Sequence, residues 1–325
     1  MIETQGLTKH FKDVKAVQGI DLTVRPGELV ALLGPNGAGK STTLRMLTTL
    51  IPPTAGTARV AGFDVVRQQR EVRQRIGYIG QGNGAGHSQR GRDELISQGR
   101  AYGLRVPEAR RRAAELIDSL GLGEVADRTV STLSGGQRRR LDIAMGLIHA
   151  PELLFLDEPS TGLDPQNRAN LQEHIVALRA RHETTIVLTT HYLDEADSMA
   201  ERVIVVDHGR VIADDSPANL KAKHVGDRII LGFAHEVDAA AAASRTTGEP
   251  QRYGTTVRIS VDGAPTLLPG VLEDLRVTGL TPTSIEVTRP TLDDVFLELT
   301  GRSLREGGAA GQTAQDTPVA QLVEA

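Results

Sequence analysis

The sequence predicts an α/β domain with a largely parallel sheet over residues 1–215, followed by a small α+β domain over residues 216–301. Two observations predict the first domain: short apolar runs rich in β-branched residues are typical of strands, and segments with helical spacing alternate with them. A third observation predicts the second domain, because strand-like runs beyond residue 215 follow one another without long crossover helices. The Gly-, Ala-, Gln- and Thr-rich end, residues 302–325, predicts a disordered tail.

The clearest strand and helix of the first domain are neighbours in the sequence. GELVALLG (27–34) is an apolar run that ends at a glycine, which is typical of a buried strand. GKSTTLRMLTTL (39–50) has leucines at helical spacing, and the two prolines at 52–53 are expected to end this helix. Two further strands are predicted at 16–24 and 56–65.

The remaining elements continue the alternation. EARRRAAELIDSLGL (108–122) predicts a helix, and three apolar runs predict strands at 153–156, 184–191 and 202–213. In the second domain an Ala-rich helix is expected between the first two of the strands predicted at 228–233, 255–261 and 283–288.

Composition limits the class of protein. The chain has 325 residues, 39% of them hydrophobic, which is enough for two domains with buried cores. Its net charge of -4 argues against a broad nucleic-acid-binding face, and the lack of cysteine excludes disulfides and thiolate sites. No apolar run reaches the roughly 18 residues of a membrane span, and the N-terminal residues do not resemble a signal peptide. The chain is therefore expected to be soluble by itself, so that a membrane role needs a partner chain.

The segment GPNGAGKS (34–41) fits the P-loop pattern. Its glycines let the backbone curl so that N–H groups point at phosphate oxygens, and the helix that follows offers its positive end to the same anion. A chance match is the alternative, but this segment lies between a predicted strand and a predicted helix, as the mechanism requires. The residues predicted to bind the nucleotide here are Gly34, Pro35, Asn36, Gly37, Ala38, Gly39, Lys40, Ser41 and Thr42.

The charged and hydroxyl groups of the predicted site have distinct tasks. Lys40 would neutralise the β- and γ-phosphates, and Ser41 would ligate Mg²⁺. LLFLDE (153–158) predicts a buried strand that ends in two acids. Asp157 would hold Mg²⁺ through water, and Glu158 would polarise the attacking water. Alone, such an ending is more often a helix cap, but a P-loop in the same chain favours the catalytic interpretation.

Taken together, these motifs resemble those of the ATPase subunit of an ABC transporter over about residues 1–215. The resemblance implies a P-loop NTPase of the ABC ATPase type with a helical subdomain over about residues 82–150, and ATP and Mg²⁺ as cofactors. The motifs that carry it are the P-loop at 34–41, Gln81 after GYIG, LSGGQ at 133–137, LLFLDE at 153–158, GLD at 162–164 and His191.

In that family the LSGGQ segment binds ATP held by the opposite subunit. Ser134, Gly135 and Gly136 are expected to cap a helix that begins near Gln137, which leaves an anion-seeking helix end lined by small residues. The segment has no acid, base, nucleophile or metal ligand of its own. We therefore expect a second copy of the chain to complete the site, in a dimer that encloses the nucleotide.

Other roles come from the resemblance alone. Phe11 matches the aromatic residue that stacks on adenine, with a core aromatic as the alternative. Gln81 matches the residue that touches Mg²⁺ and senses the membrane subunit, and it is counted among both catalytic and metal-binding residues. His191 matches the histidine that contacts the γ-phosphate, and Asp164 lies in the loop that meets the partner's site.

Two arginine runs and a glycine-rich segment lie outside these motifs. Arg110–Arg112 and Arg138–Arg140 are expected to be solvated helix faces rather than phosphate or lipid contacts. The glycine-rich stretch Gly80–Gly86 is looser than the family pattern, and its glycines are expected to supply a hinge.

The segment RPTLDDVFLELTGR (289–302) predicts a helix that Thr291 caps together with Asp294 and that Gly301 ends. Its apolar face would consist of Leu292, Val295, Phe296 and Leu299. The segment is similar to the C-terminal ending of the daunorubicin-resistance type of ABC ATPase. This resemblance implies drug or antibiotic export through a separate integral-membrane permease, at the cytoplasmic face of the membrane.

Three alternatives stay open at this point. The cargo could be a lipid, a polysaccharide or another molecule that is not a drug. A soluble ABC ATPase acting on ribosomes or DNA is disfavoured by the single P-loop, the missing coiled-coil heptads and the slight negative charge, so no nucleic-acid partner is expected. A nucleotide-gated module that does not hydrolyse ATP is disfavoured by the presence of Lys40, Asp157, Glu158 and His191.

Overall fold

The computed structural model describes residues 1–302 apart from 83, 87, 247–248, 262 and 289. The chain divides into two compact units, of which the first is Met1–Ser216 and the second begins at Pro217. The tail predicted at 302–325 lies almost wholly outside the described residues.

A six-stranded sheet forms the centre of the first unit, in the order β10-β9-β3-β8-β7-β6. Five strands are parallel and β10 pairs antiparallel with β9. Every residue of β3, β7 and β8 is buried, which explains why these strands are continuous apolar or β-branched runs. The strands are β3 (Leu29–Leu33), β6 (Ile76–Ile79), β7 (Leu153–Asp157), β8 (Thr185–Thr190), β9 (Arg202–Asp207) and β10 (Arg210–Asp215).

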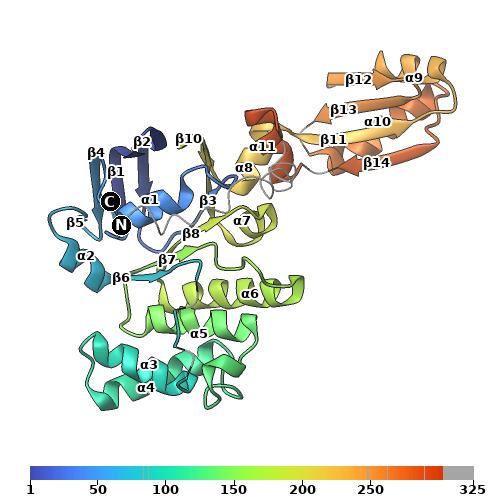
Figure 1. Ribbon diagram of the computed structural model, residues 1–325. Coiled ribbons are helices and arrows are strands. Elements are labelled where there is room, and N and C mark those ends of the chain that lie inside the picture. The colour runs from blue at the N-terminus through green and yellow to red at the C-terminus, as the bar shows by residue number, and fades with distance from the viewer. Residues whose placement is uncertain (83, 87, 247–248, 262, 289, 303–325) are drawn as a thin grey trace. The chain divides into compact units, whose positions relative to one another are not determined.

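Helices cover this sheet and form a helical layer beyond it (Figure 1). Helix α5 packs against β6 and also against α3, α4 and α6. The helix predicted at 39–50 ends at Leu47, earlier than expected, because the chain turns at Thr49, whose φ is 63°. The helices are α1 (Lys40–Leu47), α2 (Gln69–Arg75), α3 (Gly91–Ala101), α4 (Val106–Ser119), α5 (Gly135–Leu147), α6 (Pro165–His182) and α7 (Leu193–Met199), with a 3₁₀ turn at Val130–Thr132.

A second, antiparallel sheet in the same unit has the order β2-β1-β4-β5. The single strand predicted at 56–65 is wrong: it is a hairpin, because Ala61 and Gly62 both have positive φ and turn the chain. Ile2, Val24 and Val60 are fully buried in the core beneath this sheet. The strands are β1 (Ile2–Phe11), β2 (Val14–Val24), β4 (Ala55–Val60) and β5 (Phe63–Asp64).

The second unit is a four-stranded antiparallel sheet, β12-β13-β11-β14, with helices. Its core includes Ile229, Leu231 and Ile259, all fully buried. The strands are β11 (Asp227–Gly232), β12 (Glu249–Tyr253), β13 (Thr256–Val261) and β14 (Ser284–Thr288). The helices are α8 (Pro217–His224), α9 (Glu236–Ala243), α10 (Ala264–Val277) and α11 (Leu292–Thr300).

The last helix has the predicted ends. Thr291 and Asp294 form a capping box at the start of α11, and Gly301 ends the helix in the left-handed conformation. Leu292, Val295 and Phe296 are buried, and α11 packs against α8 within the same unit. Across the described part of the chain, no helix combines the length and the apolar character that crossing a bilayer requires.

Candidate active site

Parallel pairing brings the loops of the predicted site to one edge of the central sheet. Leu33 pairs with Thr190, and Asp157 pairs with Thr189, so β3, β7 and β8 end at the same level. The P-loop follows β3, Gln81 follows β6 and His191 follows β8. This carboxyl edge is where open α/β sheets bind ligands.

Close packing requires the glycines of the P-loop. A Cβ on Gly34 would lie 2.1 Å from the carbonyl oxygen of Val206, so the backbone lies against β9 with no room for a side chain. A Cβ on Gly39 would lie 2.4 Å from the carbonyl oxygen of Ala16, and its φ of 100° also favours glycine. Gly37 has open space but a φ of 81°. The loop therefore has the tight curl that turns backbone N–H groups toward an anion.

Lys40 is the first residue of α1, and only 4% of its side chain is exposed. Its Nζ donates to the carbonyl oxygens of Gly34 (2.8 Å) and Pro35 (3.1 Å), and it lies 3.6 Å from Glu158 Oε1. Burial lowers the pKa of Lys40 despite the nearby Glu158 carboxylate. The ammonium is thus held at the positive end of the helix, where a phosphate would bind.

The residues predicted to bind metal meet at Ser41. Its Oγ donates to Asp157 Oδ1 at 2.7 Å, and Gln81 Nε2 lies 3.1 Å from the same Oγ. Thr189 Oγ1 also donates to Asp157 Oδ1. Asp157 Oδ2 is buried and has no hydrogen-bond partner within the described part of the chain. The Asp157 carboxylate and the Ser41 hydroxyl are oxygen ligands that fit Mg²⁺, which takes few protein ligands and keeps several waters. The Gln81 amide lies beside them with its nitrogen toward Ser41.

Glu158 stands between two of the other predicted residues. Its Oε1 lies 3.6 Å from Lys40 Nζ, and its Oε2 lies 3.5 Å from His191 Nδ1. Its backbone has a φ of 48°, and its N–H donates to the carbonyl and hydroxyl oxygens of Thr189. Burial favours the neutral acid, but the contacts with His191 and Lys40 outweigh it and lower the pKa of Glu158. The side chain is therefore a carboxylate in the neutral pH range, as a group that polarises water must be.

The LSGGQ segment begins α5. Ser134 is the N-cap, and its hydroxyl accepts a hydrogen bond from the N–H of Gln137. In turn, the side-chain oxygen of Gln137 accepts from the N–H of Ser134, which completes a capping box. The expected helix start near Gln137 is wrong by two residues, because Gly135 and Gly136 are already helical. Ser134 and Gly135 are exposed at this helix start.

The start of α6 lies against this segment. Asp164 caps α6 by accepting from the N–H of Asn167 and also bonds its side chain. A Cβ on Gly136 would lie 2.5 Å from Asn167 Oδ1, so a side chain there would have to displace the side chain of Asn167 at the start of α6. Asp164 and the LSGGQ segment therefore share one region of the surface.

Phe11 lies at the end of β1 and is 43% exposed, with Lys9 Nζ 5.0 Å from its ring centre. The exposed ring argues against the alternative of a core aromatic. Asn36 and Gly37 are exposed at the tip of the P-loop. Ala38 is buried, and its carbonyl oxygen accepts from the N–H of Gly209.

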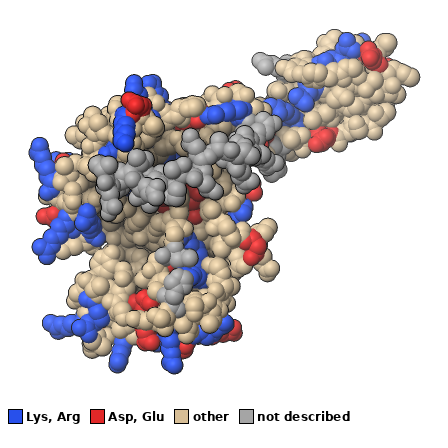
Figure 2. Space-filling model, in the orientation of Figure 1, with Lys and Arg blue, Asp and Glu red and all other residues tan. Residues whose placement is uncertain are grey.

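The sequence did not single out two residues that contact this site. Thr189 is buried in β8, two residues before His191. This position in the sequence is the signal that could have indicated it. Arg139 was expected on a solvated face with its neighbours, and this is wrong, because only 7% of it is exposed. In the other arginine run, Arg110 and Arg111 are exposed as expected, and Figure 2 shows charges of both signs over this helical part. Arg112 departs from the expectation, because only 17% of its side chain is exposed and it donates to the carbonyl oxygen of Leu147.

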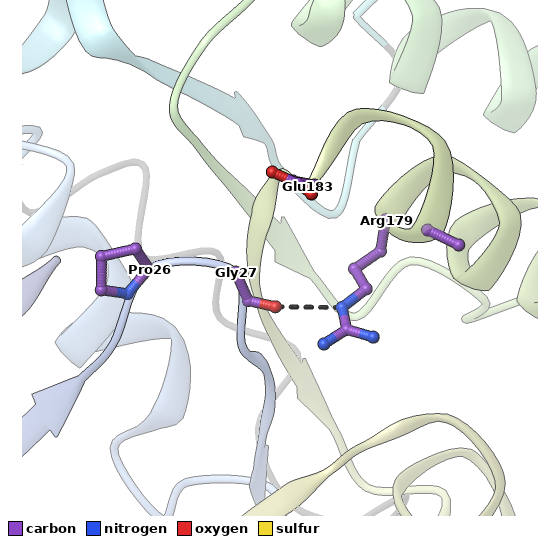
Figure 3. Close-up of a pocket in the computed structure, with 5 residues that line it drawn as sticks. Pro26, Gly27, Arg179 and Glu183 are labelled. Atoms are coloured by element: carbon purple, nitrogen blue, oxygen red, sulfur yellow. Dashed lines mark hydrogen bonds between the residues drawn. The ribbon is translucent and has the colours of Figure 1, made fainter.

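A cavity of about 500 Å³ lies at the opposite edge of the sheet. Pro26, Gly27, Arg179 and Glu183 line it, and Arg179 Nε donates to the carbonyl oxygen of Gly27 at 3.0 Å (Figure 3). Gly27 precedes β3, whereas the P-loop follows it, so this cavity is separate from the predicted nucleotide site.

A P-loop, a magnesium-compatible acid and a second acid at the carboxyl edge of a parallel sheet define a P-loop nucleotide hydrolase. The sequence profile described as ABC transporter matches residues 17–161. The chain belongs to the ABC transporter family, as an ATP-binding subunit that hydrolyses ATP, and the predicted fold class is confirmed.

Characterised relatives match almost the whole chain. The daunorubicin/doxorubicin resistance ATP-binding protein DrrA of Streptomyces peucetius is 44% identical over 310 residues, covering 92% of this chain and 92% of the relative. The linearmycin resistance ATP-binding protein LnrL of Bacillus subtilis is 33% identical and covers 94% of this chain and 100% of the relative. The resemblance to the daunorubicin-resistance type is therefore confirmed.

Solved structures of ABC transporter ATPases match about two-thirds of this chain. The cbiO1 protein from Clostridium perfringens, part of the ABC transporter complex cbiONQ, has a TM-score of 0.64 and 28% identity, covering 68% of this chain and 90% of that chain. MJ0796, described as the dimeric structure of a bacterial ABC transporter cassette, has a TM-score of 0.61 and 25% identity, covering 66% of this chain and 98% of that chain.

Proposed function

We propose that this chain supplies the energy for export of a drug or antibiotic through a separate integral-membrane permease, at the cytoplasmic face of the membrane. Support comes from the relatives named for resistance to daunorubicin, doxorubicin and linearmycin, each matched over more than nine-tenths of this chain. The cargo itself would not enter this chain. No nucleic-acid partner is proposed.

The observation that carries the chemistry is the place of the Glu158 carboxylate between Lys40 and His191. Lys40 would neutralise the β- and γ-phosphates, and Glu158 would accept a proton from the attacking water. His191, 3.5 Å from Glu158, would orient that carboxylate and contact the γ-phosphate. Ser41, Asp157 and Gln81 would hold Mg²⁺, which supplies charge neutralisation when bound.

A second copy of the chain would complete each site. The capped helix start at Ser134 exposes small residues and presents the positive end of α5, so it suits the γ-phosphate of ATP held by the other copy. Gly135 is exposed beside Ser134, Gln137 is half-buried, and the buried Gly136 lets the start of α6, with Asp164, lie against this segment. Phe11, exposed at the end of β1, would stack on adenine.

Glu158→Gln tests this proposal. The amide keeps the shape of the side chain but cannot accept the proton, so phosphate release with Mg²⁺ should fall on the order of 10²- to 10⁴-fold. ATP binding should remain, and a dimer should accumulate on gel filtration with ATP. A monomer peak under these conditions, or phosphate release at the unaltered rate, would contradict the proposal.

The cargo needs a separate test. Cells that express this chain together with its membrane permease should tolerate more doxorubicin than cells that express the Glu158→Gln chain with the same permease. A second candidate is a cargo that is not a drug. It is favoured by the Nod factor export ATP-binding protein I of Paraburkholderia xenovorans, which is 37% identical over 94% of this chain and 98% of the relative. If both strains tolerate the drug equally while the unaltered chain hydrolyses ATP, this second candidate is favoured.

A further inference from the structure

Arg139 is a buried arginine near the start of α5, and its side chain donates to three main-chain carbonyl oxygens. Nε donates to Pro159 at 2.7 Å, Nη2 donates to Asp157 at 3.3 Å, and Nη1 donates to Gly80 at 2.8 Å. One planar group therefore joins two separate loops, one after β6 and one after β7.

These two loops carry the predicted active-site residues. Gly80 immediately precedes Gln81, whose side chain contacts Ser41. Asp157 and Pro159 flank Glu158 on either side. The hydrogen bonds of Arg139 thus fix the main chain immediately next to both predicted catalytic groups.

A buried guanidinium is a costly way to hold two loops together. Burial lowers the pKa of Arg139, which reports that the charged form is penalised. Its five donors lie in a rigid plane, so it can satisfy acceptors in several fixed directions at once. An ammonium on a flexible stem does not impose the same geometry.

Helix α5 also holds the chain beyond Gln81. Asp142 Oδ1 accepts from the N–H groups of Gly84 (3.1 Å) and Ala85 (2.9 Å), and Arg138 Nη2 donates to the carbonyl oxygen of Ala85 at 3.0 Å. The glycine-rich stretch expected to act as a hinge is thus attached to α5 at Gly84 and Ala85. The segment with Gln81 is tied to one helix on both sides.

We propose that Arg139 is a positioning residue for ATP hydrolysis, which sets the distance between Gln81 and Glu158 and ties both to the helix that begins at Ser134. This inference rests on the proposed function of the site. It implies that a ligand engaging Ser134 acts on both loops through α5, because Ser134 caps this helix and Arg139 lies about one turn after its first residue, Gly135.

The test compares Arg139→Lys and Arg139→Gln with Arg140→Lys and Arg140→Gln in the full chain. Arg140 is the matched control, because it is partly buried on the same helix but donates to the carbonyl oxygen of Leu120, in the helical layer. Both Arg139 variants should lower kcat for Mg²⁺-ATP by roughly tenfold to a hundredfold, since small misplacements of catalytic groups cost this much. ATP affinity measured without Mg²⁺ should change by less than about threefold, because the P-loop is intact.

A double-mutant cycle with Gln81→Ala separates positioning from general damage. If Arg139 acts through the Gln81 loop, Arg139→Gln should lower kcat less in the Gln81→Ala background than in the unaltered chain, whereas Arg140→Gln should have equal effects in both. Thermal unfolding is measured alongside, and Arg139→Lys replaces Arg139→Gln in the cycle if the latter does not fold.

Three results would overturn the inference: an Arg139→Lys chain with unaltered kcat, equal losses in both backgrounds, or a loss of Mg²⁺-free ATP affinity that matches the loss of kcat. Failure of the unaltered chain to release phosphate would instead count against the proposed function.

Discussion

Lys40 is nearly buried, and its ammonium contacts two carbonyl oxygens of its own P-loop and the carboxylate of Glu158. Lys40→Ala should weaken ATP binding by about 2 kcal/mol or more, roughly thirtyfold in Kd, because a buried charge partner of the phosphates is lost. Calorimetry measures the Kd, with the exposed strand variant Lys15→Ala as the control. Equal affinity of both variants would remove Lys40 from the phosphate site.

The ionisation of Glu158 predicts a pH effect on stability. In the folded chain burial raises its pKa, but the contacts with His191 and Lys40 outweigh this and lower it overall. Such a group stabilises the fold above its unfolded pKa of about 4.3, and this stabilisation is lost as the pH falls through the lower, folded pKa. Between about pH 6 and pH 3, the Tm of Glu158→Gln should therefore fall less than the Tm of the unaltered chain. Parallel Tm curves would show that the two contacts do not stabilise the carboxylate.

Sequence reasoning predicted which residues of the P-loop and of the strand ending in two acids would lie together, and it failed for a residue whose place depends on packing. The structure brings Ser41 to Asp157 and Lys40 to Glu158, as the two motifs predicted. Arg139 could not be separated from the arginines on either side of it, because all three share one local context. Only the tertiary fold decides which of them faces the loops after β6 and β7.

At the scale of elements, the P-loop depends on the strand beside it. Gly34→Ala would place a Cβ 2.1 Å from the carbonyl oxygen of Val206 in β9. We expect this variant to lose about 1–3 kcal/mol of stability, as overpacked cores do, and to bind ATP more weakly. Gly82→Ala is the control, because its Cβ would meet no atom within 4 Å. Thermal unfolding of both variants is the measurement. Equal Tm values would show that β9 can shift to make room for a Cβ at position 34 without loss of stability.

The elements that the sequence predicted are those with strong apolar patterns. The buried strands β3, β7 and β8 are apolar or β-branched throughout, and so are easily recognised. The edge strand β12 contains a proline and mostly polar residues, and α10 has Pro269 in its interior, so neither has a clear pattern. The 56–65 hairpin was missed because Ala61 is an unusual residue at positive φ.

At the scale of the whole molecule, the exposed start of α5 predicts that ATP joins two chains. Adding Ser134→Arg to Glu158→Gln should weaken the ATP-dependent dimer by more than about tenfold, because a long side chain blocks the helix end from the phosphate. ATP affinity of the single chain should not change. Light scattering after gel filtration measures the dimer, with Ala101→Arg, exposed at the end of α3, as the control. A Ser134→Arg dimer as stable as the control would exclude this surface.

The turn between β9 and β10 supports the P-loop from outside its own motif. The N–H of Gly209 donates to the carbonyl oxygen of Ala38 at 2.9 Å, and the carbonyl oxygen of Gly209 accepts from the N–H of Gln18 at 2.8 Å. The β9–β10 turn, far along the chain, thus supports the P-loop through main-chain hydrogen bonds. A shortened chain for crystallising the cassette with nucleotide should therefore include residues up to Asp215. A chain that ends before Arg202 would lose the β9–β10 turn that supports the P-loop, and β3 would become an unpaired edge strand.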